Sequence, residues 1–235
     1  MNRICTQPFE SIEIDHEGYV YTCCPTWVNW YNIGNIKENS LLEIWNSEKA
    51  IALRKSILDG NYEFCSRKYC NDVGGDFKPP HLSEQDIKIE MEKLPFSVKL
   101  SYDKECNIDC KICRDYVIIN SDEEEEMWDN IFYEKIFPYL TETKRITINS
   151  HGDSFGSRHS RKVIHSIAEE YPEIKFDFHT NGTLCDENML NILGIKNKID
   201  AMRISVSAAT ADTYKKIVRH ATDKMFEKLI QNLKM

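Results

Sequence analysis

From residue 96 to the end of the chain, segments typical of strands alternate with segments typical of helices. The strand-like segments are FSVKLSY, RITINS, KFDFHTN and AMRISVSA. The helix-like segments that follow them are SDEEEEMWDNIFYEKIFPYL, RKVIHSIAEEY, DENMLNILG and a last region that begins with TADTYKKIVRH. Strands that alternate with helices form parallel sheets with right-handed crossovers. We therefore expect an α/β fold, either part of a β/α barrel or a doubly wound sheet, with its chemistry at the carboxyl ends of the strands.

The first 72 residues follow a different pattern of short segments and turns. SIEIDHEGYVYTCC predicts a β-hairpin, because apolar residues alternate along it and Glu17-Gly18 supplies the turn. SLLEIWNSEKAIALRKSILDG predicts one helix that begins after Ser40 and ends at Gly60.

The segment between these two patterns, residues 73–95, contains Gly-Gly and Pro-Pro pairs that interrupt regular structure. We expect it to be a linker with a short helix. The predicted organisation is a small domain at 1–72, the linker at 73–95 and a larger domain at 96–235.

Composition excludes some classes of function. The net charge of −8 argues against a surface for nucleic acid or an anionic membrane, which would need clustered Lys and Arg. No run approaches the roughly 20 apolar residues of a membrane helix, and MNRICTQPFESIEIDHEGYV lacks the apolar region of a signal peptide. A cytoplasmic location is therefore expected.

Nine cysteines are many for a cytoplasmic chain, where thiols serve more often as metal ligands or catalytic groups than as disulfides. Buried thiols that act as small apolar side chains are the alternative. Seven of the nine fall into two spaced groups, which favours ligands. Cys185 stands apart in TNGTLCDENML and is interpreted as structural.

One of the two groups consists of Cys106, Cys110 and Cys113. These cysteines have C-x3-C-x2-C spacing and directly follow the first strand of the alternating region. Thiolates select zinc or iron–sulfur clusters. A structural zinc site normally has four ligands, whereas a 4Fe–4S cluster held by three cysteines leaves one iron open. The spacing therefore favours a cluster with a free position for a substrate or cofactor.

CNIDCKIC in this position resembles the hallmark of the radical S-adenosylmethionine (radical SAM) enzymes. Three further segments resemble that family in the same order: NSHGDSFGS after the second strand, HTNGTL after the third, and RISVSAATADTYKKI at the fourth. The resemblance implies a partial (β/α) barrel of the radical SAM type with about four βα units.

The resemblance also implies the chemistry. Cys106, Cys110 and Cys113 would hold a 4Fe–4S cluster whose open iron binds SAM, and one electron would cleave SAM to a 5′-deoxyadenosyl radical that abstracts hydrogen from a substrate. The implied SAM-binding residues are Gly152, Asp153, Asn181, Ser205 and Ser207.

Three positions depart from the family pattern. Ile112 replaces an aromatic residue, Asp153 replaces a longer Glu, and Ser154 stands where Pro is common. His151 and His179 are interpreted as ordinary loop or strand residues.

The first group of cysteines resembles the start of a SPASM domain, the auxiliary-cluster module of many radical SAM enzymes. Cys5, Gly18 and Cys23 have C-x12-G-x4-C spacing, and FCSRKYC closes the pattern with Cys65 and Cys70. The resemblance implies an auxiliary 4Fe–4S cluster on Cys5, Cys23, Cys65 and Cys70. Cys24 is an alternative to Cys23, and zinc is an alternative to the cluster.

The resemblance implies a radical SAM oxidoreductase or maturase that modifies a peptide by oxidation, cross-linking or epimerisation. The alternatives are dehydrogenation of a sugar or small alcohol, and a catalytically silent protein that binds clusters or partners. An external one-electron donor such as flavodoxin or ferredoxin is expected. The family's barrels have six βα units, so we expect either a fragment or a natural chain that is short.

Overall fold

The computed structural model describes residues 5–70, 73, 89–148 and 151–234. The chain divides into two compact units. The first consists of Met1–Lys99 and Asn130–Lys144, and the second of Leu100–Asp129 and Arg145–Met235. Among the described residues, no helix combines the length and the apolar character that crossing a membrane requires.

The first unit contains a small antiparallel sheet and short helices. Its elements are α1 (Gln7–Glu10), β1 (Ser11–Ile14), β2 (Tyr19–Tyr21), β3 (Gly34–Asn35), α2 (Leu41–Trp45), α3 (Glu48–Leu58), β4 (Ser97–Leu100) and the 3-10 helix η2 (Phe137–Glu142). The strand order is β3-β2-β1-β4. The predicted hairpin is confirmed, because β1 and β2 pair antiparallel and Gly18 in their turn has φ +90°.

The helix predicted between Ser40 and Gly60 is two helices. Ser40 caps α2, accepting a hydrogen bond from the backbone N–H of Glu43, whose side chain bonds back to the backbone of Ser40. The chain then leaves the helix at Asn46, and Ser47 caps α3 by accepting from Ala50 N. A single-helix prediction was wrong here because the apolar spacing continues across a second cap.

The strand predicted to open the larger domain is β4, and its residues 97–99 belong to the first compact unit. Most of the predicted linker, including its expected short helix, lies outside the described residues. The domain boundaries predicted at 72 and 96 stay predictions.

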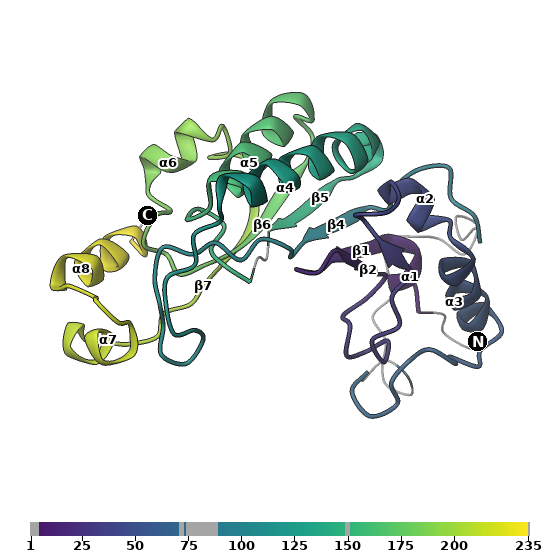
Figure 1. Ribbon diagram of the computed structural model, residues 1–235, viewed down its shortest axis with the longest axis horizontal. Coiled ribbons are helices and arrows are strands. Elements are labelled where there is room, and N and C mark those ends of the chain that lie inside the picture. Colours follow the sequence, from purple (N-terminus) through teal and green to yellow (C-terminus); the bar gives the residue numbers. More distant parts are fainter. Residues whose placement is uncertain (1–4, 71–72, 74–88, 149–150, 235) are drawn as a thin grey trace. The chain divides into compact units, whose positions relative to one another are not determined.

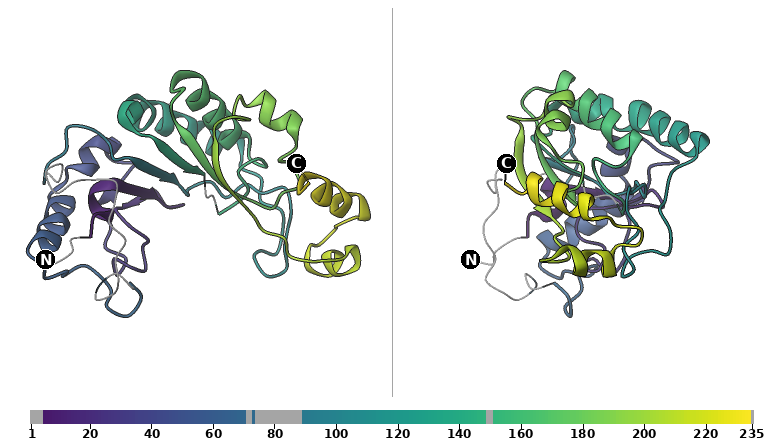
Figure 2. Two further views of the ribbon diagram at one scale, coloured as in Figure 1. Left: turned by 180° about the vertical axis from the view of Figure 1, so that it is seen from behind. Right: turned by 90° about the vertical axis from the view of Figure 1, so that its left-hand side faces the viewer.

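The second unit has a parallel sheet with helices. Its elements are the start of α4 (Asp122–Lys135), β5 (Arg145–Ile148), α5 (Arg158–Glu170), β6 (Lys175–Thr180), α6 (Glu187–Ile192), β7 (Ile199–Ile204), α7 (Ala211–Ile217) and α8 (Asp223–Asn232). β5 pairs parallel with β6, and β6 pairs parallel with β7. In Figures 1 and 2, α5 and α6 lie on one face of these strands, and α7 lies next to α8.

Apolar side chains of β5 and β6 form the core of this sheet. Phe176 and Phe178 are fully buried, and Phe178 contacts Phe155 with ring centroids 5.0 Å apart. The mixed α/β architecture is confirmed: antiparallel strands lie in the first unit and parallel strands in the second. The barrel geometry itself stays a prediction. The three parallel strands end at loops that bear several predicted site residues.

Gly182, in the loop after β6, offers a test of this packing. Its φ is +82°, and a Cβ there would lie 2.6 Å from Ile204 and 2.7 Å from Leu229. We expect Gly182→Ala to lower the free energy of unfolding by about 2–4 kcal/mol, from backbone strain plus overpacking. Urea unfolding of the cluster-free chain measures this loss.

Gly194→Ala is the matched control. Gly194 has φ +69° and nothing within 4 Å of an added Cβ. The alanine variant therefore has the backbone strain of a positive φ without the overpacking. Equal losses for the two variants would contradict the close packing at Gly182.

Candidate functional site

The loop after β4 holds Cys106, Cys110 and Cys113 in the second unit. Cys106 is buried, Cys110 is half-buried and Cys113 is exposed. The backbone N–H of Cys106 donates to Ile118 O at 3.0 Å, and that of Cys113 donates to Cys110 O at 2.9 Å. These bonds fold the loop back on itself, so the three thiols are held in one short, closed segment.

The end of α7 fixes the other side of this loop. Lys111 N donates to Ile217 O at 2.9 Å, and Arg219 N donates to Asp109 O at 3.2 Å. Cys110 forms an isolated antiparallel bridge with Val218. The segment after β7 therefore orients the middle cysteine.

Arg114 is a site residue that the sequence analysis missed, although it adjoins Cys113. Its guanidinium donates to Lys104 O at 3.1 Å and to His151 O, and one Nη lies 3.6 Å from the Sγ of Cys113. Arg114 therefore both ties the loop to the segment after β5 and places positive charge at Cys113.

Gly152, predicted to bind SAM, lies where no side chain fits. A Cβ there would be 1.9 Å from the carbonyl oxygen of Glu105. Its N–H donates to Asp103 O at 3.1 Å, and Asp153 N donates to Glu105 O at 2.8 Å. The segment after β5 thus runs against the backbone that leads into Cys106.

The Asp153 carboxylate is 1% exposed and bonded on both oxygens. One oxygen accepts from the N–H groups of Phe155 and Gly156, both at 3.0 Å. The other accepts from Thr180 Oγ1 at 2.8 Å and from Asn181 N at 2.7 Å. Four donors fill the usual capacity of a carboxylate, so Asp153 joins the loop after β5 to the end of β6.

Asn181, also predicted to bind SAM, lies next to the cysteine loop. Its side-chain nitrogen donates to Asn107 Oδ1 at 2.9 Å and lies 3.9 Å from the Sγ of Cys106. Asn107 in turn donates to Thr183 at 2.9 Å. The structure therefore brings together the loops after β5 and β6 and the cysteine loop.

Ser205 and Ser207 follow β7. Ser205 is exposed and its N–H donates to Thr180 O at 2.9 Å, and Ser207 is half-buried. The departure at Ser154 has a structural reason, since its buried hydroxyl bonds Ile148 O at 3.1 Å and His179 O at 2.8 Å. A proline has no side-chain hydroxyl, so it could not make these hydrogen bonds between the ends of β5 and β6.

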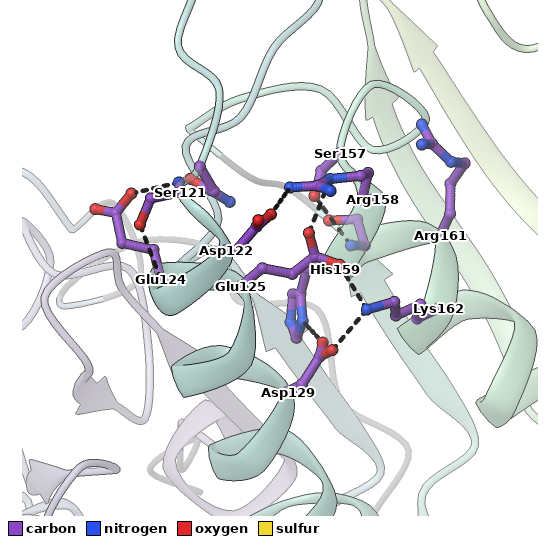
Figure 3. Close-up of polar contacts among 12 residues, drawn as sticks. Ser121, Asp122, Glu124, Glu125, Asp129, Ser157, Arg158, His159, Arg161 and Lys162 are labelled. Atoms are coloured by element: carbon purple, nitrogen blue, oxygen red, sulfur yellow. Dashed lines mark hydrogen bonds and ion pairs between the residues drawn. The ribbon is translucent and has the colours of Figure 1, made fainter.

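A partly buried polar network joins α4 and α5 next to these loops (Figure 3). His159 bonds Asp129 at 2.5 Å and Tyr102 at 2.9 Å, and Lys162 bonds Asp129 at 2.8 Å. An ionised carboxylate only accepts, so the His159 Nδ1 donates to Asp129 and its Nε2 accepts from Tyr102. Next to it, Ser160 bonds Asp103 at 2.9 Å. The start of α5 is thereby fastened to the segment before the cysteine loop.

The first unit contains the other grouped cysteines, three of which pack against one apolar core. Cys5, Cys23 and Cys65 pack against a core of Phe9, Tyr21, Val28, Leu53 and Ile57. Burial, then the neighbouring thiols Cys5 and Cys70, hold the pKa of Cys23 well above its usual range. Burial and the neighbouring Cys70 raise the pKa of Cys65 to about 11.

The structure favours Cys23 over Cys24 as a ligand. Cys23 interacts with Cys5 and Cys70, whereas the Sγ of Cys24 lies 3.3 Å from the hydroxyl of Thr26. Cys185 is buried beside Gly182 O at 3.5 Å, which agrees with the structural role expected for it.

Arg54 was missed in the sequence and orders the first unit. It is fully buried and donates to the carbonyls of Pro8, Ile89 and Trp45 at 2.8–3.0 Å. Burial lowers its pKa to about 10. Its bond to Pro8 anchors the segment that follows Cys5.

The thiols fit an iron–sulfur cluster in their chemistry. None of the nine cysteines is in a disulfide. Burial first, and then the neighbouring thiols Cys106 and Cys113, raise the pKa of Cys110, while burial raises that of Cys106. Grouped buried thiols ionise together only when a cation compensates their charge. No three His, Cys, Asp or Glu side chains within the described ranges converge closely enough to hold one metal ion.

Comparison with known proteins identifies the first unit's cysteine pattern. Residues 5–71 match SPASM, an iron–sulfur cluster-binding domain. The chain therefore contains a SPASM domain, and the match confirms that part of the resemblance drawn from the sequence. No curated protein matches the chain.

One solved structure that matches is titled "Crystal structure of BtrN in complex with AdoMet and 2-DOIA". It is 16% identical with a TM-score of 0.34, and the match covers 59% of this chain and 56% of that one. The match thus spans just over half of that protein's length.

The choice of Cys23 as a ligand in the SPASM domain predicts different iron contents for alanine variants of Cys23 and its neighbour Cys24. Cys23→Ala should lose about half of the reconstituted iron, because one of the two expected clusters would lose a ligand. Cys24→Ala should keep it all. Iron and sulfide analysis after anaerobic reconstitution distinguishes them, and an equal loss in Cys24→Ala would exclude Cys23 as the sole ligand of the pair.

The network between α4 and α5 predicts a pH dependence. Burial opposes ionisation of Asp129, but bonds from Lys162 and His159 outweigh it, so its pKa lies below the ordinary value of 3.8. A lowered pKa stabilises the fold above pH 3.8, and this contribution is lost as pH falls further. Asp129→Asn should cost about 1–2 kcal/mol at pH 7, with the difference shrinking below pH 3.8.

Urea unfolding of the cluster-free chain from pH 7 to pH 3 measures that difference. Asp122→Asn is the control, because Asp122 lies on the same helix and bonds Arg158 at 3.0 Å but is 89% exposed. It should cost less than about 0.5 kcal/mol. A constant difference for Asp129→Asn across this range would contradict the lowered pKa.

Proposed function

We propose that the chain is a radical SAM protein whose second unit holds a 4Fe–4S cluster on Cys106, Cys110 and Cys113. The observation that carries this proposal is the C-x3-C-x2-C loop, held against the loops that follow β5 and β6. Three thiols in one short loop leave a fourth position for a cofactor.

When bound, the cluster supplies one electron that cleaves SAM and yields a 5′-deoxyadenosyl radical for hydrogen abstraction. The chain's own residues hold and shield that site. Cys106 is buried on the inner side of the loop, and Cys113 faces outward beside the Arg114 guanidinium. This arrangement gives an external one-electron donor, such as flavodoxin or ferredoxin, access from the Cys113 side.

Gly152, Asn181, Ser205 and Ser207 are proposed to contact SAM. Gly152 allows close approach of the backbone, and the exposed Ser205 presents its hydroxyl at the end of β7. Asp153 is better suited to position this loop than to meet SAM itself, because its oxygens already accept four hydrogen bonds. SAM would then meet the backbone that Asp153 orders.

The SPASM domain is proposed to hold an auxiliary 4Fe–4S cluster on Cys5, Cys23, Cys65 and Cys70. Such a cluster would accept an electron from the substrate radical or help to bind the substrate. The proposed substrate is a peptide that undergoes oxidation, cross-linking or epimerisation. This choice rests on the resemblance to SPASM-containing radical SAM enzymes, with a sugar or small alcohol as the alternative.

The proposal predicts SAM cleavage by the reconstituted chain. Anaerobic incubation with SAM and dithionite should give 5′-deoxyadenosine, measured by liquid chromatography and mass spectrometry. The triple variant Cys106→Ala, Cys110→Ala, Cys113→Ala should lose this product because the cluster has no ligands.

Cys185→Ala is the matched control, since it removes a buried thiol outside both groups. It should retain product formation. No product from the fully loaded wild-type chain would contradict a catalytic role and favour a protein that only binds clusters.

A further inference from the structure

Tyr214 on α7 carries a buried hydroxyl that the proposed function does not use. The residue is 2% exposed. Its hydroxyl has no hydrogen-bond partner among the described residues. Buried hydroxyl groups are nearly always bonded, so an exception needs an explanation, such as a ligand that completes the site.

The ring is held beside the cysteine loop. Tyr214 shares a core with Cys106, Ile108 and Val218, and Cys110 packs against the same core. The ring of Tyr214 also contacts the ring of Phe226 on α8, and the two ring centroids are 5.6 Å apart. This position is also evident in the electrostatics: burial raises the pKa of Tyr214, and Cys110 and then Cys106 raise it further.

The backbone fixes this placement. Val218 N donates to Tyr214 O at 2.8 Å, and Ile217 O accepts from Lys111 N at 2.9 Å. Val218 itself bridges Cys110. One turn of helix therefore connects Tyr214 to the residue that pairs with the middle cysteine.

We propose that the hydroxyl of Tyr214 donates a hydrogen bond to a sulfur of the cluster held by Cys106, Cys110 and Cys113, beside Cys110. The inference rests on the proposed function, because it requires a cluster at this loop. Cluster sulfurs are acceptors, and a phenol O–H supplies the donor that they need. Hydrogen bonds to the sulfurs set the reduction potential, and donation stabilises the more negative, reduced form. Tyr214 thus raises the reduction potential of the SAM-binding cluster.

The test compares Tyr214→Phe with the wild-type full chain after reconstitution. The signal of this cluster is identified as the one that the Cys106, Cys110, Cys113 triple-Ala variant lacks. Redox titration followed by electron paramagnetic resonance should show a more negative midpoint potential in Tyr214→Phe. Tyr171→Phe, at the end of α5, should leave the potential unchanged.

Two further measurements separate this role from a structural one. The cluster-free Tyr214→Phe chain should unfold at the same urea concentration as the wild type or a higher one, because the hydroxyl has no partner to lose. In D2O, resonance Raman iron–sulfur bands of the wild type should shift relative to H2O, and this shift should be smaller in Tyr214→Phe, which lacks one exchangeable donor.

The outcomes also distinguish a failure of this inference from a failure of the proposed function on which it rests. If the triple-Ala variant keeps the full iron content, no cluster lies at this loop and the proposed function fails. If the cluster is present but Tyr214→Phe leaves its potential and the D2O shift unchanged, only the role of Tyr214 is overturned.

Discussion

The buried carboxylate of Asp153 organises the proposed catalytic end of the second unit. Two backbone N–H groups of its own loop bind one oxygen, and Thr180 and Asn181 bind the other. Asn181 then contacts Asn107 and approaches Cys106. A charge this deeply buried is stable only when fully bonded, so the loops after β5 and β6 and the cysteine loop depend on one another for their positions.

Thiol electrostatics impose a second constraint on both units. Of the grouped cysteines only Cys113 is exposed. Burial, and then neighbouring thiols, raise the pKa of Cys23, Cys65 and Cys110. Such groups are costly to ionise together without a compensating cation. The guanidinium of Arg114 lies 3.6 Å from the Sγ of Cys113 and also favours ionisation of Cys106 and Cys110, but burial outweighs its effect on their pKa values. In the folded chain these thiols can ionise together only when a bound cation compensates their charge. This requirement is consistent with the match of residues 5–71 to the SPASM iron–sulfur domain.

Local features of the chain were readable from the sequence. Both cysteine groups, the hairpin at Gly18 and the helix start after Ser40 follow from short-range patterns, and the structure confirms the hairpin and the Ser40 cap. The second cap at Ser47 was also readable, because a Ser followed by Glu is a common helix start, but the continuing apolar spacing concealed it.

Contacts between segments far apart in the chain could not be predicted from the sequence. Two of the four partners of Asp153 lie 27 and 28 residues away, and the residues of α7 and just after it that bond the cysteine loop lie more than 100 residues from the cysteines. Asp153 was predicted to meet SAM because a motif marks which residues matter without showing what each one touches. Tyr214 had no signal beyond its place on an amphipathic helix, since its burial beside Cys110 arises only from tertiary packing.

The central claim is that the chain holds two clusters and that only the one in the second unit has an open iron. Electron paramagnetic resonance of the reduced chain, recorded with and without SAM, tests it most directly. The account predicts two signals, of which SAM changes only the one that requires Cys106, Cys110 and Cys113. A spectrum in which SAM alters neither signal, or alters the one that requires Cys5, Cys23, Cys65 and Cys70, would contradict it.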